Sequence, residues 1–143
     1  MAPQRKSCLI VVENLPVPFD RHVWQMALAL REAGWRVRII CPATERAPMR
    51  RETIAGIDIH RHALPDGGHG RGSYIREYGW ALFHELRLIF SLFAAERFSV
   101  LHACNPPDFI LLAALPLKLF GVRFVFDQHD LSPNCTNRVT VAV

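Results

Sequence analysis

Several patterns that mark common protein classes are missing from this sequence. Its four cysteines form no C-x-x-C pair, and the first three lie in or beside apolar strand-like runs, which predicts reduced, buried thiols. The longest apolar region, 78–98, is interrupted by charged and histidine side chains, so it falls short of the roughly 20 apolar residues that span a bilayer. The first apolar run, 8–12, is too short for a secretory signal. We therefore expect a cytoplasmic location.

The sequence also lacks a strong excess of either positive or negative charge. Seventeen Lys and Arg against thirteen Asp and Glu give a net charge of +4 over 143 residues, and the arginines are scattered. This distribution predicts no nucleic-acid partner, although a mild positive excess suits an anionic ligand or an anionic membrane face. With 50% apolar and 21% charged residues, the composition is that of a globular protein, and the length predicts one compact domain.

Short apolar runs alternate with helical patterns along the chain. Continuous β-branched runs predict buried strands at 8–12, 37–41, 100–104 and 123–127, and alternating polarity predicts a half-exposed edge strand at 57–62. Helices are predicted at 21–33, 74–96 and 108–120, the last with a kink or break at Pro116. This order predicts an α/β fold with a doubly wound, parallel, Rossmann-like sheet.

Polar loops follow three of the predicted strands, and in such sheets ligands bind beyond the carboxyl ends of the strands. The candidate binding residues are Asn14, Asp20, Arg21, Asn105 and Asp108. Asp20 also fits the N-cap of the first helix, whose N-terminus could receive an anion together with Arg21. Because Asn, Asp and Pro also close turns, purely structural roles stay open.

His129 is the strongest candidate for a catalytic side chain. It follows the last predicted strand and is flanked by Asp127 and Asp130, either of which could orient its ring or raise its basicity. A metal site is not predicted, because His60 and His62 share a strand face without an evident third ligand.

The glycine-rich dinucleotide fingerprint is absent after the first strand, where Pro16 and Pro18 stand, which argues against an NAD-dependent oxidoreductase. The predicted helix 74–96 carries more apolar side chains than one face against a sheet needs. It could rest on a membrane, although burial against the sheet or against a partner domain is the commoner explanation.

Five segments, taken in order, resemble the N-terminal domain of family 4 glycosyltransferases of the GT-B fold. They are Leu15-Pro-Val-Pro-Phe-Asp-Arg-His-Val-Trp24, Ile40-Cys-Pro42, Gly56-Ile-Asp-Ile-His60, Leu101-His-Ala-Cys-Asn-Pro-Pro-Asp108 and Phe126-Asp-Gln-His-Asp-Leu-Ser-Pro133. The resemblance implies a family domain at 1–133 and an atypical tail at 134–143.

The resemblance implies a two-lobed, retaining enzyme without metal or cofactor that transfers a sugar from a nucleotide-sugar donor to a saccharide or lipid-linked acceptor. Such enzymes build surface polysaccharides or glycolipids, some at the inner face of the membrane. In the family the N-terminal lobe mainly binds the acceptor. The loop 14–21 and the segment 105–108 would then line the cleft, and His129 with Asp130 would face the transferred sugar.

After Pro133 the family continues with a donor-binding lobe, whereas this sequence ends at Val143. We therefore expect a truncated glycosyltransferase lobe that is inactive by itself. The alternative is a stand-alone binding module that docks to a partner lobe or a membrane surface.

Overall fold

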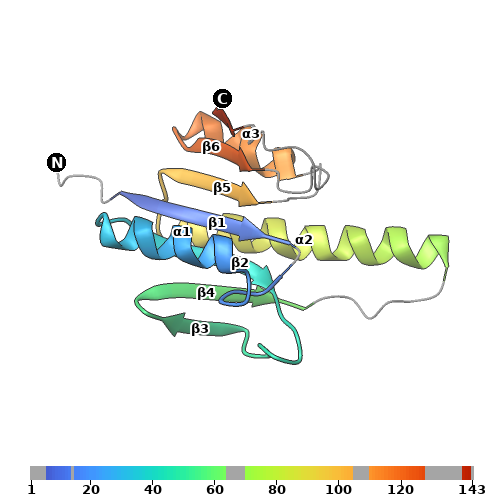
Figure 1. Ribbon diagram of the computed structural model, residues 1–143. Helices are drawn as coiled ribbons and strands as arrows, with labels where there is room; N and C mark the ends of the chain where they lie inside the picture. Colours follow the sequence, from blue (N-terminus) through green and yellow to red (C-terminus); the bar gives the residue numbers. More distant parts are fainter. Residues whose placement is uncertain (1–5, 14, 64–69, 105–109, 128–139, 143) are drawn as a thin grey trace.

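The computed structural model describes residues 6–13, 15–63, 70–104, 110–127 and 140–142 (Figure 1). The elements within these ranges are β1 Ser7–Val12, α1 Arg21–Glu32, β2 Arg36–Pro42, β3 Arg51–Ile54, β4 Ile57–His62, α2 Arg71–Ala95, β5 Val100–Cys104, α3 Leu111–Leu119, β6 Arg123–Asp127 and β7 Thr140–Ala142. No helix in the described part of the chain combines the length and the apolar character needed to cross a membrane.

The strands form one sheet in the order β3-β4-β2-β1-β5-β6-β7. The five central strands are parallel, while β3 and β7 pair antiparallel with β4 and β6 at the two edges. From β1 the chain moves outward through β2 to β4, and α2 then carries it back to β5 on the other side of β1. The strand order therefore reverses between β1 and β5, which confirms the predicted doubly wound fold.

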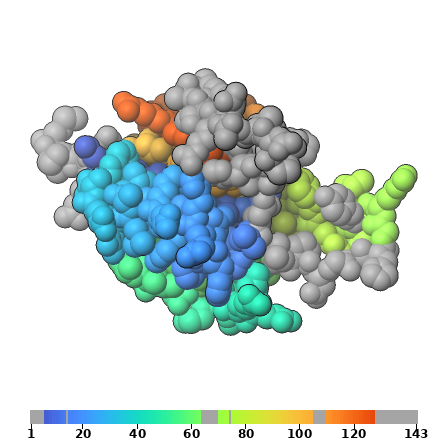
Figure 2. All heavy atoms as spheres, in the orientation of Figure 1, coloured from blue at the N-terminus to red at the C-terminus, as the bar shows by residue number. Residues whose placement is uncertain are grey.

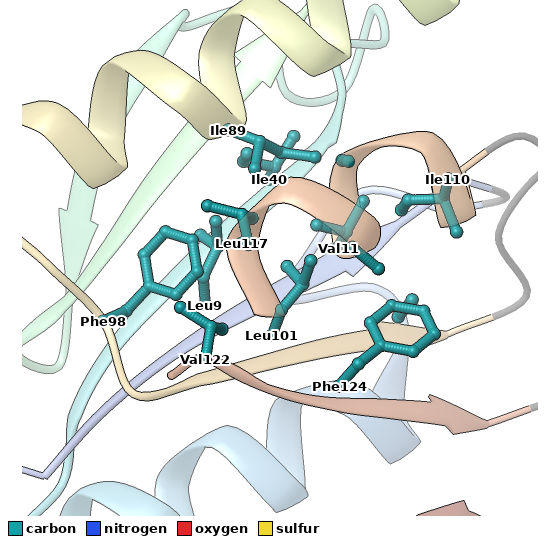
Figure 3. Close-up of a cluster of buried hydrophobic side chains, with 13 residues drawn as sticks. Leu9, Val11, Ile40, Ile89, Phe98, Leu101, Ile110, Leu117, Val122 and Phe124 are labelled. Carbon is teal, nitrogen blue, oxygen red and sulfur yellow. The ribbon is translucent and has the colours of Figure 1, made fainter. Parts of the chain in front are cut away.

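Helices cover both faces of this sheet, α1 on one side and α2 with α3 on the other (Figure 1). Because strand side chains alternate, Leu9 and Val11 of β1 pack toward α2 and α3, whereas Ile10 packs toward α1. Figure 3 shows Ile89 of α2 and Leu117 of α3 in one hydrophobic cluster with Leu9 and Val11. Burial on both faces is the physical reason why the central strands are continuous apolar runs.

The structure corrects one local prediction and excludes one of the two outcomes predicted for Pro116, a kink or a break. The strand at 57–62 is not an edge strand, because β3 pairs with its outer side and leaves His60 only 8% exposed. Pro116 does not break α3, which continues to Leu119. Proline has no N–H to donate to the carbonyl one turn earlier, which belongs to the exposed residue Leu112.

Candidate functional site

The strands β1, β5 and β6 end at the same edge of the sheet, next to the N-terminus of α1. This edge is the switch point at which ligands bind in doubly wound sheets. Of the seven candidate residues named from the sequence, the structure describes Asp20 and Arg21. The others lie outside the described residues, and they are Asn14, Asn105, Asp108, His129 and Asp130.

Asp127, the last residue of β6, lies between two histidines. Its Oδ2 is 3.9 Å from His22 Nε2, in the first turn of α1, and 3.7 Å from His102 Nε2, on β5. The His102 and Asp127 side chains are mostly buried, at 14% and 19% exposure, whereas that of His22 is 45% exposed. A carboxylate and two imidazoles thus meet at this edge, and His22 is the exposed member of the three.

The pairing of β5 with β6 explains this grouping. Cys104 stands opposite Asp127 in the parallel register, and alternation places His102 on the same face as both. One donor atom from each of these three residues lies within 4.8 Å of the other two. Among the described residues they are the group that could hold a metal ion, with nitrogen, sulfur and oxygen donors.

Cys104 is a neutral thiol in this setting. Burial raises its pKa to about 12, and the charges of Asp127, Asp20 and Cys8 add to the effect. A thiol of this kind is a poor nucleophile at neutral pH. Since the charge of Asp20 acts on this thiol, the start of α1 lies near the cluster on β5 and β6. We call His22, His102, Cys104 and Asp127 the switch-point cluster.

The predicted N-cap role of Asp20 is confirmed. Its Oδ1 accepts a hydrogen bond from the Val23 N–H at 3.1 Å, which satisfies one free donor of the helix N-terminus. Arg21 is the first residue of α1 and is exposed. The substrate-binding roles predicted for Asp20 and Arg21 stay predictions.

A pair of acidic residues lies on the opposite face of the sheet. Glu85, in the middle of α2, is 1% exposed, and its Oε1 has no hydrogen-bond partner in the part of the chain that the structure describes. Burial, followed by the charge of Glu13, raises the pKa of Glu85 to about 8. Glu13 directly follows β1, and burial raises its pKa to about 7. Glu85 therefore holds its proton at neutral pH, where Glu13 is about half protonated.

Sequence reasoning did not name the switch-point cluster as a site. A signal was available in the spacing of His102 and Cys104, because residues two apart share one face of a strand. Both come directly before a polar loop, and Asp127 ends the next strand. The partnership of His22 with Asp127 had no such signal, because it joins a helix to a strand far along the chain. Glu85 looked like one of several polar interruptions in an apolar helix.

Together the fold and this cluster define a Rossmann-like domain with a group of polar side chains at the switch point of its sheet. A family model described as glycosyl transferase 4-like domain matches residues 20–140. The chain belongs to that family. Comparison with curated proteins gave no match.

Two solved structures show the same fold. A sucrose-phosphate synthase from Thermosynechococcus elongatus matches with a TM-score of 0.59 and 16% identity, over 89% of this chain and 34% of that one. The C-terminal domain of a hydrogenase from Pyrococcus furiosus matches with a TM-score of 0.58 and 14% identity, over 87% of this chain and 92% of that one. The chain thus spans about a third of the synthase.

Proposed function

We propose that this domain is the acceptor-binding lobe of a retaining glycosyltransferase, which transfers a sugar from a nucleotide-sugar donor to a saccharide or lipid-linked acceptor. The observation that carries the proposal is the carboxylate of Asp127 between His22 and His102, at the switch point of a domain of this family. The pathway we propose is surface polysaccharide or glycolipid biosynthesis, on the cytoplasmic side at the inner face of the membrane.

The chemistry of the switch-point cluster fits sugar hydroxyl groups. A hydroxyl needs one acceptor for its proton and one donor for its lone pair, and a carboxylate beside an imidazole N–H supplies both. The exposed His22 can contact a ligand, while the more buried His102 lies 3.7 Å from Asp127 and helps to position its carboxylate. In this proposal Asp127 orients the acceptor hydroxyl toward the sugar that is transferred.

Residues outside the described ranges enter the proposal by resemblance to the family alone. His129 and Asp130 are proposed to face the transferred sugar, where polar groups stabilise the charge that develops as the phosphate leaves. Asn14, Asn105 and Asp108 are proposed to line the acceptor side together with Asp20 and Arg21. We propose that the nucleotide-sugar is held by a second lobe and that neither a metal nor a further cofactor takes part.

Ligand titration followed by NMR tests the proposal. The isotope-labelled chain is titrated with a panel of short saccharides and, separately, with UDP-glucose and GDP-mannose. We expect a saccharide, but neither nucleotide-sugar, to shift the imidazole signals of His22 and His102. Asp127→Asn is expected to weaken saccharide binding about tenfold or more, the scale of a lost charge-assisted hydrogen bond.

Asp58→Asn is the matched control, because Asp58 lies near the amino end of β4 and pairs there with Arg36 and Thr53. Equal weakening by the two variants, or no saccharide binding at all, would contradict the proposal. Robust sugar transfer by the chain alone would contradict the need for a second lobe.

A further inference from the structure

A cleft of about 530 Å³ lies between the carboxyl end of β4 and the helix α2, on the sheet face opposite α1. It is lined by Arg50, Arg61, His62, Ala63, Trp80, His84, Arg87, Leu88 and Ser91. Three of these are arginines, two are histidines and none is acidic, so the cleft is suited to an anion. Neither the switch-point cluster nor any candidate residue from the sequence lines it.

The arginines of this basic cleft differ in their surroundings. Arg61 is buried and already satisfied, because it contacts the Glu52 carboxylate at 2.7 Å and the backbone carbonyl of Val17 at 2.9 Å. Arg50 and Arg87 are exposed, and neither lies within ion-pair distance of a carboxylate among the described residues. Two cations thus line the cleft with no carboxylate partner among the described residues.

His62 adds a buried polar atom to the same cleft. Its Nδ1 lies 3.4 Å from the carbonyl oxygen of Ala63, while its Nε2 is buried without a hydrogen-bond partner in the described ranges. When the ring is protonated, Nε2 becomes a donor that an anionic oxygen would satisfy. Burial and the neighbouring His84 lower the pKa of His62, and a bound anion would oppose both effects.

The helix beside the cleft carries an unusual apolar surface. The first turns of α2 extend beyond the ends of the strands (Figure 1), and this part of the helix projects from the body of the molecule (Figure 2). Ile75, Trp80 and Phe83 are 72%, 62% and 56% exposed there. Trp80 and Phe83 lie with ring centroids 6.3 Å apart, and both contact the ring of His84, which lines the cleft.

Helical spacing places the aromatic side chains of Trp80 and Phe83 on the same side of α2 as the guanidinium of Arg87. Positions three and four apart share a side of a helix, so Trp80, Phe83 and Arg87 follow one another along the same side of α2. Exposed Trp and Phe beside Arg are typical of helices that lie in the interface of a membrane. A free phosphate would explain the arginines but not this aromatic surface.

We propose that the basic cleft binds the phosphate group of a membrane lipid, while Ile75, Trp80 and Phe83 enter the membrane interface. Arg50 and Arg87 contact the phosphate, and α2 lies along the bilayer surface without crossing it. The inference deepens the proposed membrane contact and rests on that part of the proposed function. It assigns the lipid phosphate to a site apart from the switch-point cluster.

Vesicle sedimentation tests this inference with the chain as it is. Vesicles of phosphatidylcholine with about one third phosphatidylglycerol are compared with vesicles of phosphatidylcholine alone, and wild-type protein is expected to bind the former. The double variant Arg50→Gln/Arg87→Gln is expected to bind about thirtyfold more weakly, as for two basic groups removed from an anionic surface. Trp80→Ala/Phe83→Ala is expected to weaken binding as well.

Arg46→Gln/Arg123→Gln is the matched control, because it removes the same charge from two exposed positions outside the cleft. Equal losses in the two arginine variants would reduce the effect to net charge and overturn the inference. Absence of vesicle binding would also overturn it, and millimolar inorganic phosphate bound without vesicles would then identify a site for a free anion.

The variant Asp127→Asn separates this inference from the proposed function. It is expected to bind vesicles like wild type even where it loses saccharide binding. A loss of vesicle binding in this variant would contradict the assignment of the lipid phosphate to a separate site.

Discussion

Replacing the buried Glu85 with glutamine is expected to flatten the pH dependence of the stability of this domain. Glutamine keeps the size and shape of the side chain but cannot ionise. Glu85 is 1% exposed, and burial together with the charge of Glu13 raises its pKa to about 8, against 4.5 for an unperturbed glutamate. The wild-type fold therefore prefers the protonated carboxyl, whereas the unfolded chain does not.

The sign and the size of the effect follow from proton linkage. Above pH 4.5 the unfolded chain releases the Glu85 proton while the folded chain keeps it, so rising pH favours unfolding. Each pH unit within this window costs about 1.4 kcal/mol, and the loss ends near pH 8, where both states are ionised. Between pH 4.5 and pH 7, Glu85 thus lowers the free energy of unfolding by about 3 kcal/mol.

Urea unfolding between pH 4.5 and pH 8.5 measures this difference. The stability of Glu85→Gln relative to wild type is expected to rise up to about pH 8 and then to level off, whatever the absolute stability of the variant at pH 4.5. Glu45→Gln is the matched control, because Glu45 is exposed. Parallel pH profiles for wild type and Glu85→Gln would refute the reasoning.

Two further predictions concern the cap of α1 and the buried thiols of the sheet. Asp20→Ala removes the acceptor for the Val23 N–H and is expected to lower the free energy of unfolding by about 1 kcal/mol, while Asp20→Asn retains it; an unchanged urea midpoint in Asp20→Ala would contradict the cap. In a Cys135→Ser background, the buried thiols of Cys8, Cys41 and Cys104 are expected to react with Ellman's reagent only after denaturation, because burial raises the pKa of all three. Rapid labelling of the native chain would show that these thiols are accessible.

The strands and helices that depend on local pattern were predictable from the sequence. The apolar runs of β1, β2, β5 and β6 lie close to their expected positions, because strands covered by helices on both sides need apolar side chains throughout. The cap at Asp20 was predictable for a similar reason, since its hydrogen bond joins residues three positions apart.

The edge strands were not predictable in this way. The four residues of β3 and the three of β7 carry too little pattern, and each strand exists through antiparallel pairing with a neighbour. β7 falls within the segment 134–143 that was expected to be an atypical tail. Because β3 was not predicted, β4 was wrongly expected to lie at an edge of the sheet.

By itself, the sequence determined the α/β class, the order of the buried strands along the chain, the polar loops that follow them and the resemblance to the glycosyltransferase family. Only the tertiary structure decided which polar side chains meet there. The pairing of β5 with β6 brings His102 beside Asp127, and the packing of α1 adds His22. Likewise, the position of α2 against the sheet buries Glu85 while leaving Trp80 exposed. Burial and side-chain contacts depend on partners distant in sequence, which no local pattern contains.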